Sequence, residues 1–71
     1  MPTSWTPERI RTLRVRLGLT LEELAATLGY SGGRLSAWRL EQPVGSPHHV
    51  TARGPVVVIL DLLEHQEGQK T

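Results

Sequence analysis

The chain has 71 residues, a formal net charge of +1 at pH 7 and no cysteine. We expect one small domain without a separate catalytic or sensory module, and the missing thiols exclude disulfides and thiolate metal sites. No apolar run approaches the roughly 20 residues that span a bilayer, and no secretory leader is recognisable, so we expect a cytoplasmic protein without membrane contact. Residues 1–40 hold six arginines against three glutamates, whereas residues 41–71 hold two cations against four carboxylates. Positive potential is therefore expected in the first half of the chain.

The first predicted element is a helix over residues 7–17. Thr6 suits the N-cap, and Pro7 fits the first helical position, where its missing N–H costs no hydrogen bond. Gly18 ends the helix, and Trp5 is expected to pack against it as a hydrophobic staple. The buried stripe consists of Ile10, Leu13 and Leu17.

A second helix is predicted over residues 21–28. Thr20 and Glu23 have the spacing of a capping box, in which each side chain accepts the other's backbone N–H. Gly29 favours the left-handed conformation that ends a helix. One face carries Leu21, Leu24, Ala25 and Leu28, as an amphipathic helix requires.

A third helix is predicted over residues 32–40, with Ser31 as its N-cap. Leu35 and Trp38 lie three residues apart and are expected to face inward, which leaves small and cationic side chains for the outer face. The two helices and their connection have the outline of a helix-turn-helix, whose second helix can enter the major groove of DNA.

This stretch resembles the Xre/Cro-type helix-turn-helix regulators of bacteria and their phages. The matching positions are Leu19, Thr20, Glu23, Leu24, Ala25, Leu28, Gly29, Ser31, Leu35, Ser36 and Trp38. The resemblance implies a lambda-repressor-like fold, an all-α bundle of four helices with a central helix-turn-helix, as a single domain over residues 1–71. It also implies sequence-specific binding of double-stranded DNA by a small transcriptional repressor that often acts on its own promoter.

The sequence departs from the family pattern at three places. Relatives commonly pair an arginine at the place of Arg14 with an acidic residue directly after the tryptophan, but Arg39 stands there, so Arg14 needs Glu41 or another partner, or stays solvated. Leu21 replaces a glutamine that touches the DNA backbone in many relatives. The usual base-reading positions are the first two after the cap and one a turn later, which here are Gly32, Gly33 and Ala37. None of these side chains can make a bidentate contact with a base edge.

We therefore expect the backbone of the third helix to approach the DNA closely and Ala37 to contact a thymine methyl group. Other outward residues are expected to make the polar contacts with the bases. Arg34 is the first candidate for a guanine contact, with contact to phosphate alone as the alternative. The candidate DNA-binding residues are Ser31, Gly32, Gly33, Arg34, Ser36, Ala37, Arg39, Arg16, Thr20, Leu21, His48, His49 and Arg53.

Residues 41–53 contain two prolines and a glycine and predict a long loop. Because the loop follows the third helix directly, His48, His49 and Arg53 are candidates for contact with the DNA backbone; solvent-exposed loop histidines are the plainer alternative. A histidine pair also suggests a metal, but neither a cysteine nor a nearby pair of carboxylates accompanies it, so no metal site is expected.

The last predicted helix covers residues 55–66, with Pro55 at its first position, and residues 67–71 form a tail. Residues 56–59 also have strand propensity, but the length of the apolar segment and the preceding proline favour a helix. Its inner stripe is Val56, Ile59, Leu60 and Leu63. The surplus apolar side chains Val57, Val58 and Leu62 predict the interface of a homodimer, which would match a palindromic operator.

Two functions of different classes remain open. A dimeric DNA-binding repressor is favoured by the helix-turn-helix pattern. A protein-interaction or assembly module, such as an antitoxin or a phage packaging component, is the alternative because glycine and alanine at the reading positions weaken direct readout. An enzyme, a cofactor and a small-molecule ligand are not expected, because a four-helix chain of this size offers no cleft for paired titratable groups.

Overall fold

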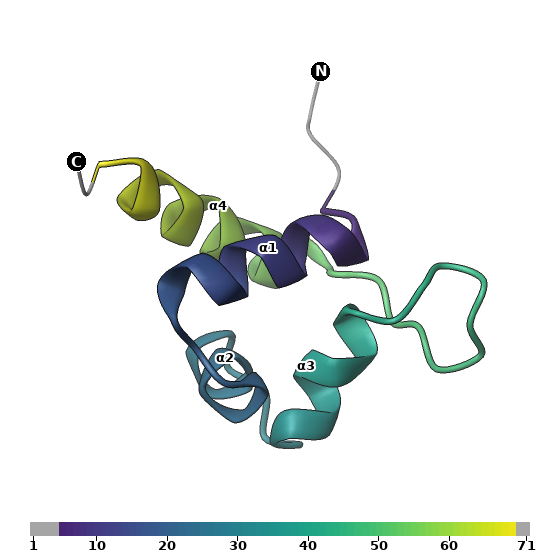
Figure 1. Ribbon diagram of the computed structural model, residues 1–71. Coiled ribbons are helices and arrows are strands. Elements are labelled where there is room, and N and C mark those ends of the chain that lie inside the picture. The colour runs from purple at the N-terminus through teal and green to yellow at the C-terminus, as the bar shows by residue number, and fades with distance from the viewer. Residues whose placement is uncertain (1–4, 70–71) are drawn as a thin grey trace.

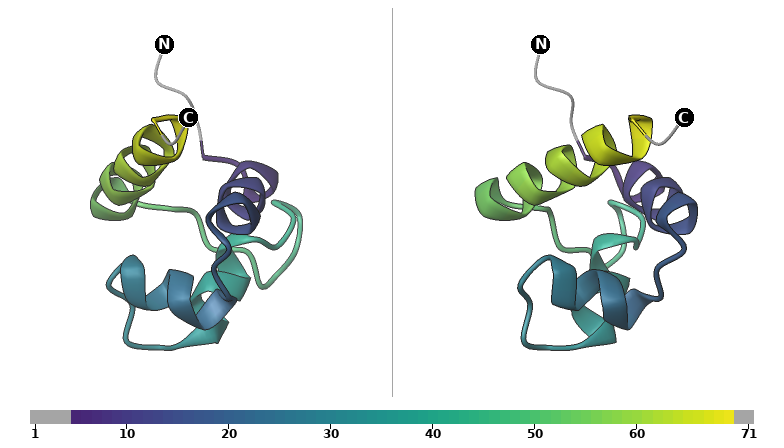
Figure 2. Two further views of the ribbon diagram at one scale, coloured as in Figure 1. Left: turned by 60° about the vertical axis from the view of Figure 1, so that its left-hand side comes forward. Right: turned by 90° about the vertical axis from the view of Figure 1, so that its left-hand side faces the viewer.

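The computed structural model describes residues 5–69 and contains four helices: α1 (Pro7–Leu17), α2 (Leu21–Thr27), α3 (Arg34–Leu40) and α4 (Gly54–Gly68). No strand occurs in this part of the chain. α1 packs against α4 on one side of the molecule, and α2 packs against α3 on the other (Figure 1, Figure 2). The prediction of a small all-α domain with four helices is confirmed for this part of the chain, and the two central helices pack against each other.

Side chains that the sequence identifies fix the starts of α1 and α2. Thr6 Oγ1 accepts the backbone N–H of Arg9 at 3.2 Å, and Pro7 occupies the first helical position. The Glu23 N–H donates to Thr20 Oγ1 at 3.1 Å, while the Thr20 N–H donates to Glu23 Oε1 at 2.9 Å. Both predicted caps, including the capping box, are confirmed.

A left-handed glycine follows each of the first two helices, with φ +70° at Gly18 and +84° at Gly29. After α2, the Tyr30 N–H donates to the Ala25 carbonyl at 2.9 Å and the Gly29 N–H to the Ala26 carbonyl at 3.1 Å. This pair of hydrogen bonds is a Schellman motif, and a side chain at Gly29 would resist the conformation it needs. Gly29 therefore sets the direction in which the chain leaves α2.

One apolar core joins the two helix pairs. Each helix contributes one of the four largest fully buried side chains of this core. These are Ile10, Leu24, Leu40 and Leu60. Trp5 closes the core next to α1 and α4: it is buried, and its Nε1–H donates to Asp61 Oδ1 at 2.8 Å. The predicted packing of Trp5 against α1 thus extends to α4, through a hydrogen bond that satisfies the indole N–H.

α3 begins later than predicted. Its first residue is Arg34 rather than residue 32, and the residue before it is Gly33, which offers no side-chain cap. Ser31 is exposed in the connection after α2. The prediction of Ser31 as N-cap is therefore wrong.

The register of α3 also differs from the prediction. Ala37 and Leu40 are 0% exposed and form its buried side. Leu35, which was expected to face inward, is 51% exposed, and Trp38 is only half-buried. The inward-facing pair keeps the spacing of three residues but lies two residues later in the sequence than predicted.

The other boundaries differ by one or two residues. α2 ends at Thr27 instead of residue 28, and α4 takes in Gly54 and two residues of the predicted tail; residues 70 and 71 lie outside the described part. The predicted loop over 41–53 contains neither helix nor strand and projects sideways beyond α3 (Figure 1). None of the four described helices is long and apolar enough to cross a membrane.

Candidate nucleic-acid interface

Two glycines shape the connection that leads into α3. Gly33 has φ +68° and ψ −155°, a backbone conformation that is strongly unfavourable for every residue except glycine. A Cβ added to Gly32 would collide with the Oγ of Ser36 unless that side chain moved. The prediction that both glycines are helical positions is wrong, because they form the turn that delays the start of the helix.

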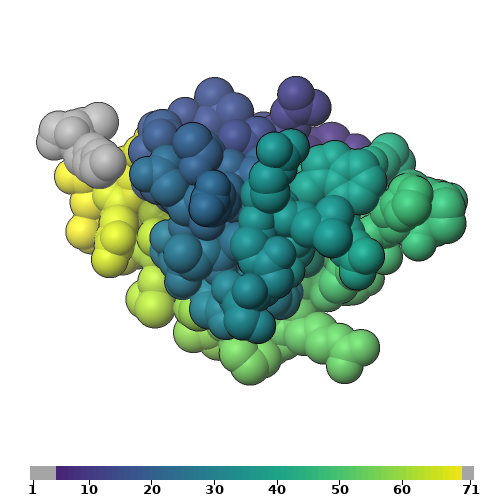
Figure 3. Space-filling view, turned by 90° about the horizontal axis from the view of Figure 1, so that it is seen from below, coloured from purple at the N-terminus to yellow at the C-terminus, as the bar shows by residue number. Residues whose placement is uncertain are grey.

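The outward side of α3, which we call the α3 face, consists of Arg34, Leu35, Trp38 and Arg39. Residues four apart are neighbours on a helix surface, so Arg34 with Trp38 and Leu35 with Arg39 form two adjacent rows, which face away from the buried Ala37 and Leu40. Arg34, Leu35 and Arg39 are exposed, and Trp38 is half-buried. Viewed from below, the α2–α3 pair occupies the centre of the surface with the loop beside it (Figure 3). The α3 face therefore combines two guanidinium groups with apolar surface.

Two predicted contact residues of α3 do not belong to this face. Ala37 is fully buried between α3 and the core, so its predicted contact with a thymine methyl is wrong. Ser36 is half-buried on the flank of the helix, beside the Gly32 turn. Of the α3 residues predicted from sequence to read DNA, Arg34 and Arg39 are on the outward side.

The carboxylate nearest the end of α3 in sequence is held away from the α3 face. Glu41 Oε2 lies 2.6 Å from Arg14 Nε, and Glu41 Oε1 accepts a second bond from the same guanidinium at 3.2 Å. The Glu41 side chain is 7% exposed, and Arg14 also donates to the Leu19 carbonyl. Arg14 therefore pairs with Glu41, and neither pairs with another residue instead nor stays solvated.

The start of α2 contributes a hollow of about 410 Å³ next to α3, lined by Arg14, Thr20, Leu21, Glu22 and Arg34. The Thr20 side chain is exposed but already accepts the capping hydrogen bond. Leu21 is half-buried against the core. Glu22 brings a negative charge to the same hollow as Arg34, which opposes the approach of phosphate at this end of the α3 face.

The loop returns to the C-terminal end of α3. The Gln42 side chain donates to the Trp38 carbonyl at 3.2 Å, and the Val50 N–H donates to the Arg39 carbonyl at 3.3 Å. These bonds bring the exposed His48 ring to 5.5 Å from the Trp38 ring, between centroids. His48 thereby becomes a neighbour of the α3 face.

The other predicted loop residues have different environments. His49 is half-buried, and its Nδ1 lies 3.0 Å from the Gln42 carbonyl oxygen, so this ring is engaged within the loop. Arg53 is exposed and precedes the first residue of α4. Across residues 5–69, no group of three or more histidine, aspartate or glutamate side chains is arranged to hold a metal ion.

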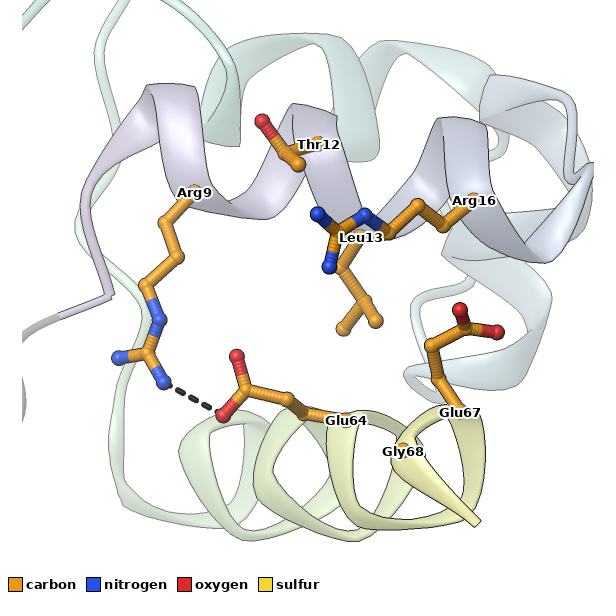
Figure 4. A pocket seen from close by; sticks show the side chains of 7 residues that line it. All are labelled: Arg9, Thr12, Leu13, Arg16, Glu64, Glu67 and Gly68. Carbon is orange, nitrogen blue, oxygen red and sulfur yellow. Dashed lines mark hydrogen bonds and ion pairs between the residues drawn. The ribbon is translucent and has the colours of Figure 1, made fainter. Parts of the chain in front are cut away.

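Arg16 belongs to a different surface. It lines a hollow of about 410 Å³ between α1 and α4, together with Arg9, Thr12, Leu13, Glu64, Glu67 and Gly68 (Figure 4). Arg9 Nη2 lies 2.6 Å from Glu64 Oε1, and the Arg16 guanidinium points into the same space as Glu67. Arg16 therefore lines a different hollow from the one that Arg34, Thr20 and Leu21 line, and two carboxylates, Glu64 and Glu67, line the Arg16 hollow with it.

The predicted interface on α4 is divided by the structure. Val58 and Leu62, one turn apart, are 58% and 57% exposed. Val57 is half-buried and packs against the core. The exposed apolar surface of α4 therefore consists of Val58 and Leu62 and does not include Val57.

Sequence reasoning missed Leu35 and the half-exposed Trp38 as parts of the outward surface. Ala37 and Leu40 have the same spacing as Leu35 and Trp38, so periodicity allowed both registers and gave no signal that Leu35 and Trp38 face outward. Comparison of the chain with protein-family models, with curated proteins and with solved structures finds no significant match.

Proposed function

We propose that this protein binds double-stranded DNA through the α3 face and acts as a small transcriptional repressor, including of its own promoter. The observation that carries the proposal is the composition of that face: Arg34 and Arg39 are exposed on either side of Leu35, while the neighbouring Glu41 is turned away into its ion pair with Arg14. Guanidinium groups suit both phosphate and the major-groove edge of guanine.

The observed register strengthens the case for readout of base edges. Counted from the cap at Gly33, the first two helical positions and the position a turn later are Arg34, Leu35 and Arg39. The same offsets counted from Ser31 had given two glycines and an alanine. The resemblance itself matches Ser31 and assigns reading to Gly32, Gly33 and Ala37, so it is the observed register that supplies exposed side chains able to contact bases.

The proposal includes a homodimer formed through Val58 and Leu62 of α4. Two exposed apolar side chains one turn apart are a suitable centre for a self-complementary contact. Two copies related by a two-fold axis would present two α3 faces to a palindromic operator, and repression would follow from occlusion of the promoter.

The experiment is a mobility-shift titration of the full chain against the region upstream of its own gene, at two salt concentrations. The proposed function expects a specific complex whose affinity falls steeply with salt, because phosphate contacts release counterions. Equal affinity for that region and for a shuffled duplex of the same composition would contradict specific binding, and no complex at low salt would contradict DNA binding altogether.

A protein-interaction or assembly module is the second candidate. It is favoured by the exposed apolar side chains Leu35, Val58 and Leu62, which lie on two different helices. A protein that retains no duplex but forms a stable complex with a co-purifying partner in pull-down would support this candidate over the first.

A further inference from the structure

We infer that Leu35 reads the 5-methyl group of a thymine in the major groove, an inference that rests on the proposed DNA binding through α3. Leu35 is 51% exposed although it is a large aliphatic residue on a short helix whose other side is fully buried. Covering an aliphatic side chain breaks no hydrogen bond. The side chain adds to the free energy of binding only where the partner also presents apolar surface. The methyl group of thymine is the apolar group that DNA exposes in its major groove.

The charges beside Leu35 indicate what kind of partner covers it. Arg34 precedes it and Arg39 lies one turn later on the same side of α3, and both are exposed. Two guanidinium groups beside one leucine are complementary to a groove bordered by phosphates, whereas a protein partner would have to place carboxylates opposite both of them. The α3 face is therefore complementary to duplex DNA, and Leu35 is the only aliphatic side chain among its four members.

The spacing along α3 places the methyl contact close to the arginine contacts. Five residues of helix span about 7.5 Å, so the backbones of Arg34 and Arg39 are separated by about two base-pair steps of roughly 3.4 Å. Arginine pairs most specifically with guanine. We therefore expect a short core in which the thymine read by Leu35 lies within about three base pairs of a guanine.

The register of α3 makes this an assignment to Leu35 and to no other aliphatic residue of the helix. Ala37, the other small apolar candidate, is 0% exposed, as is Leu40. Trp38 is half-buried, and its ring already contacts His48. Leu35 is therefore the one aliphatic side chain of α3 that is exposed and able to contact a base methyl group.

The test removes the thymine methyl group and the Leu35 side chain, separately and together, and measures DNA affinity each time. Duplexes retained by the full chain are selected from a random library, and each thymine of the best duplex is then replaced singly by deoxyuridine, which removes only the methyl. The wild-type chain is expected to lose about fourfold in affinity at one thymine of each half-site, the effect of uncovering one methyl group. The Leu35→Ala variant is expected to bind the thymine and deoxyuridine duplexes equally.

The control variant is Val15→Ala, which removes a 63% exposed apolar side chain from α1 and is expected to keep the fourfold preference. Equal binding of every thymine and deoxyuridine duplex by the wild-type chain overturns the inference while leaving the proposed function intact. So does a Leu35→Ala variant that keeps the preference, which would assign the methyl contact to another side chain. A library from which no duplex is retained overturns the proposed function itself, and this inference with it.

Discussion

Arg14 of α1 and Glu41, the residue directly after α3, are joined by two hydrogen bonds of 2.6 and 3.2 Å between the guanidinium and the carboxylate. The same guanidinium donates to the Leu19 carbonyl just before α2. One side chain thus links the end of α1, the start of α2 and the end of α3. Since Glu41 directly follows the buried Leu40, this link helps to fix which side of α3 faces outward.

Removal of the Glu41 carboxylate is expected to be costly. Glu41→Ala leaves the Arg14 guanidinium, whose side chain is 18% exposed, without its counter-charge, so we expect the free energy of unfolding to fall by about 3 kcal/mol. Urea denaturation followed by circular dichroism measures this loss. The matched control is Glu64→Ala: Glu64 pairs with Arg9 at the same distance but is 46% exposed, so its loss should cost less than about 1 kcal/mol. Equal losses in the two variants would contradict the structural role given to Glu41.

Gly33→Ala is expected to lower the free energy of unfolding by about 1–3 kcal/mol, because a Cβ is strained at φ +68° and ψ −155°. Gly45→Ala is the control, since a Cβ at that loop position meets nothing within 4 Å and its φ is not positive, so the change should stay within about 0.5 kcal/mol. Urea midpoints of the two variants give the comparison. A Gly33→Ala variant as stable as Gly45→Ala would mean that Gly33 does not adopt this conformation.

How much of the molecule could be predicted from sequence differs from one helix to the next. The boundaries of α1 and α2 followed from local chemistry: Thr6, Thr20 and the glycines at 18 and 29 each satisfy backbone groups within a few residues. Such signals depend on neighbours in the chain and are therefore readable without a structure.

The register of α3 could not be read in that way. Leu35 with Trp38 and Ala37 with Leu40 are equally spaced, so periodicity alone does not choose between them. The choice depends on Gly33, whose backbone delays the helix, and on a partner 27 residues away, since Arg14 pairs with Glu41. Because the outward residues follow from this register, an error of two residues changed the candidate site from glycines and alanine to arginines and leucine.

The register itself is testable by stability. Ala37→Leu adds three carbon atoms at a fully buried position and should cost about 1–3 kcal/mol through overpacking. Leu35→Ala shortens a side chain that is 51% exposed and should cost less than about 1 kcal/mol. The sequence-based register expects the opposite order, with the larger loss at Leu35, so thermal denaturation of the two variants decides between the registers.

The α3 arginines should dominate DNA affinity. Arg34→Ala and Arg39→Ala are each expected to weaken specific binding by about 1–3 kcal/mol, because both guanidinium groups are exposed beside Leu35. Fluorescence anisotropy at several salt concentrations separates two roles: a base contact relaxes preference at one base pair, whereas a phosphate contact weakens all sequences alike and lowers the salt slope. Arg11→Ala removes an equal charge from the exposed side of α1 and should leave specific affinity within about 0.5 kcal/mol. Equal losses of affinity at all three positions would mean that the α3 arginines contribute only general positive charge.

The proposed dimer depends on exposed residues of α4 and can be separated from the fold. Leu62→Asp places a charge where the side chain is 57% exposed, so the helical circular dichroism spectrum should be retained. In a dimer the same carboxylates would be buried close together without partners, so the variant should sediment as a monomer and bind a palindromic site less tightly. Val15→Asp introduces the same charge at a 63% exposed position of α1 and should keep the sedimentation behaviour of the wild type. A wild-type chain that sediments as a monomer at micromolar concentration, or a Leu62→Asp variant with the mass of a wild-type dimer, would remove α4 as the interface.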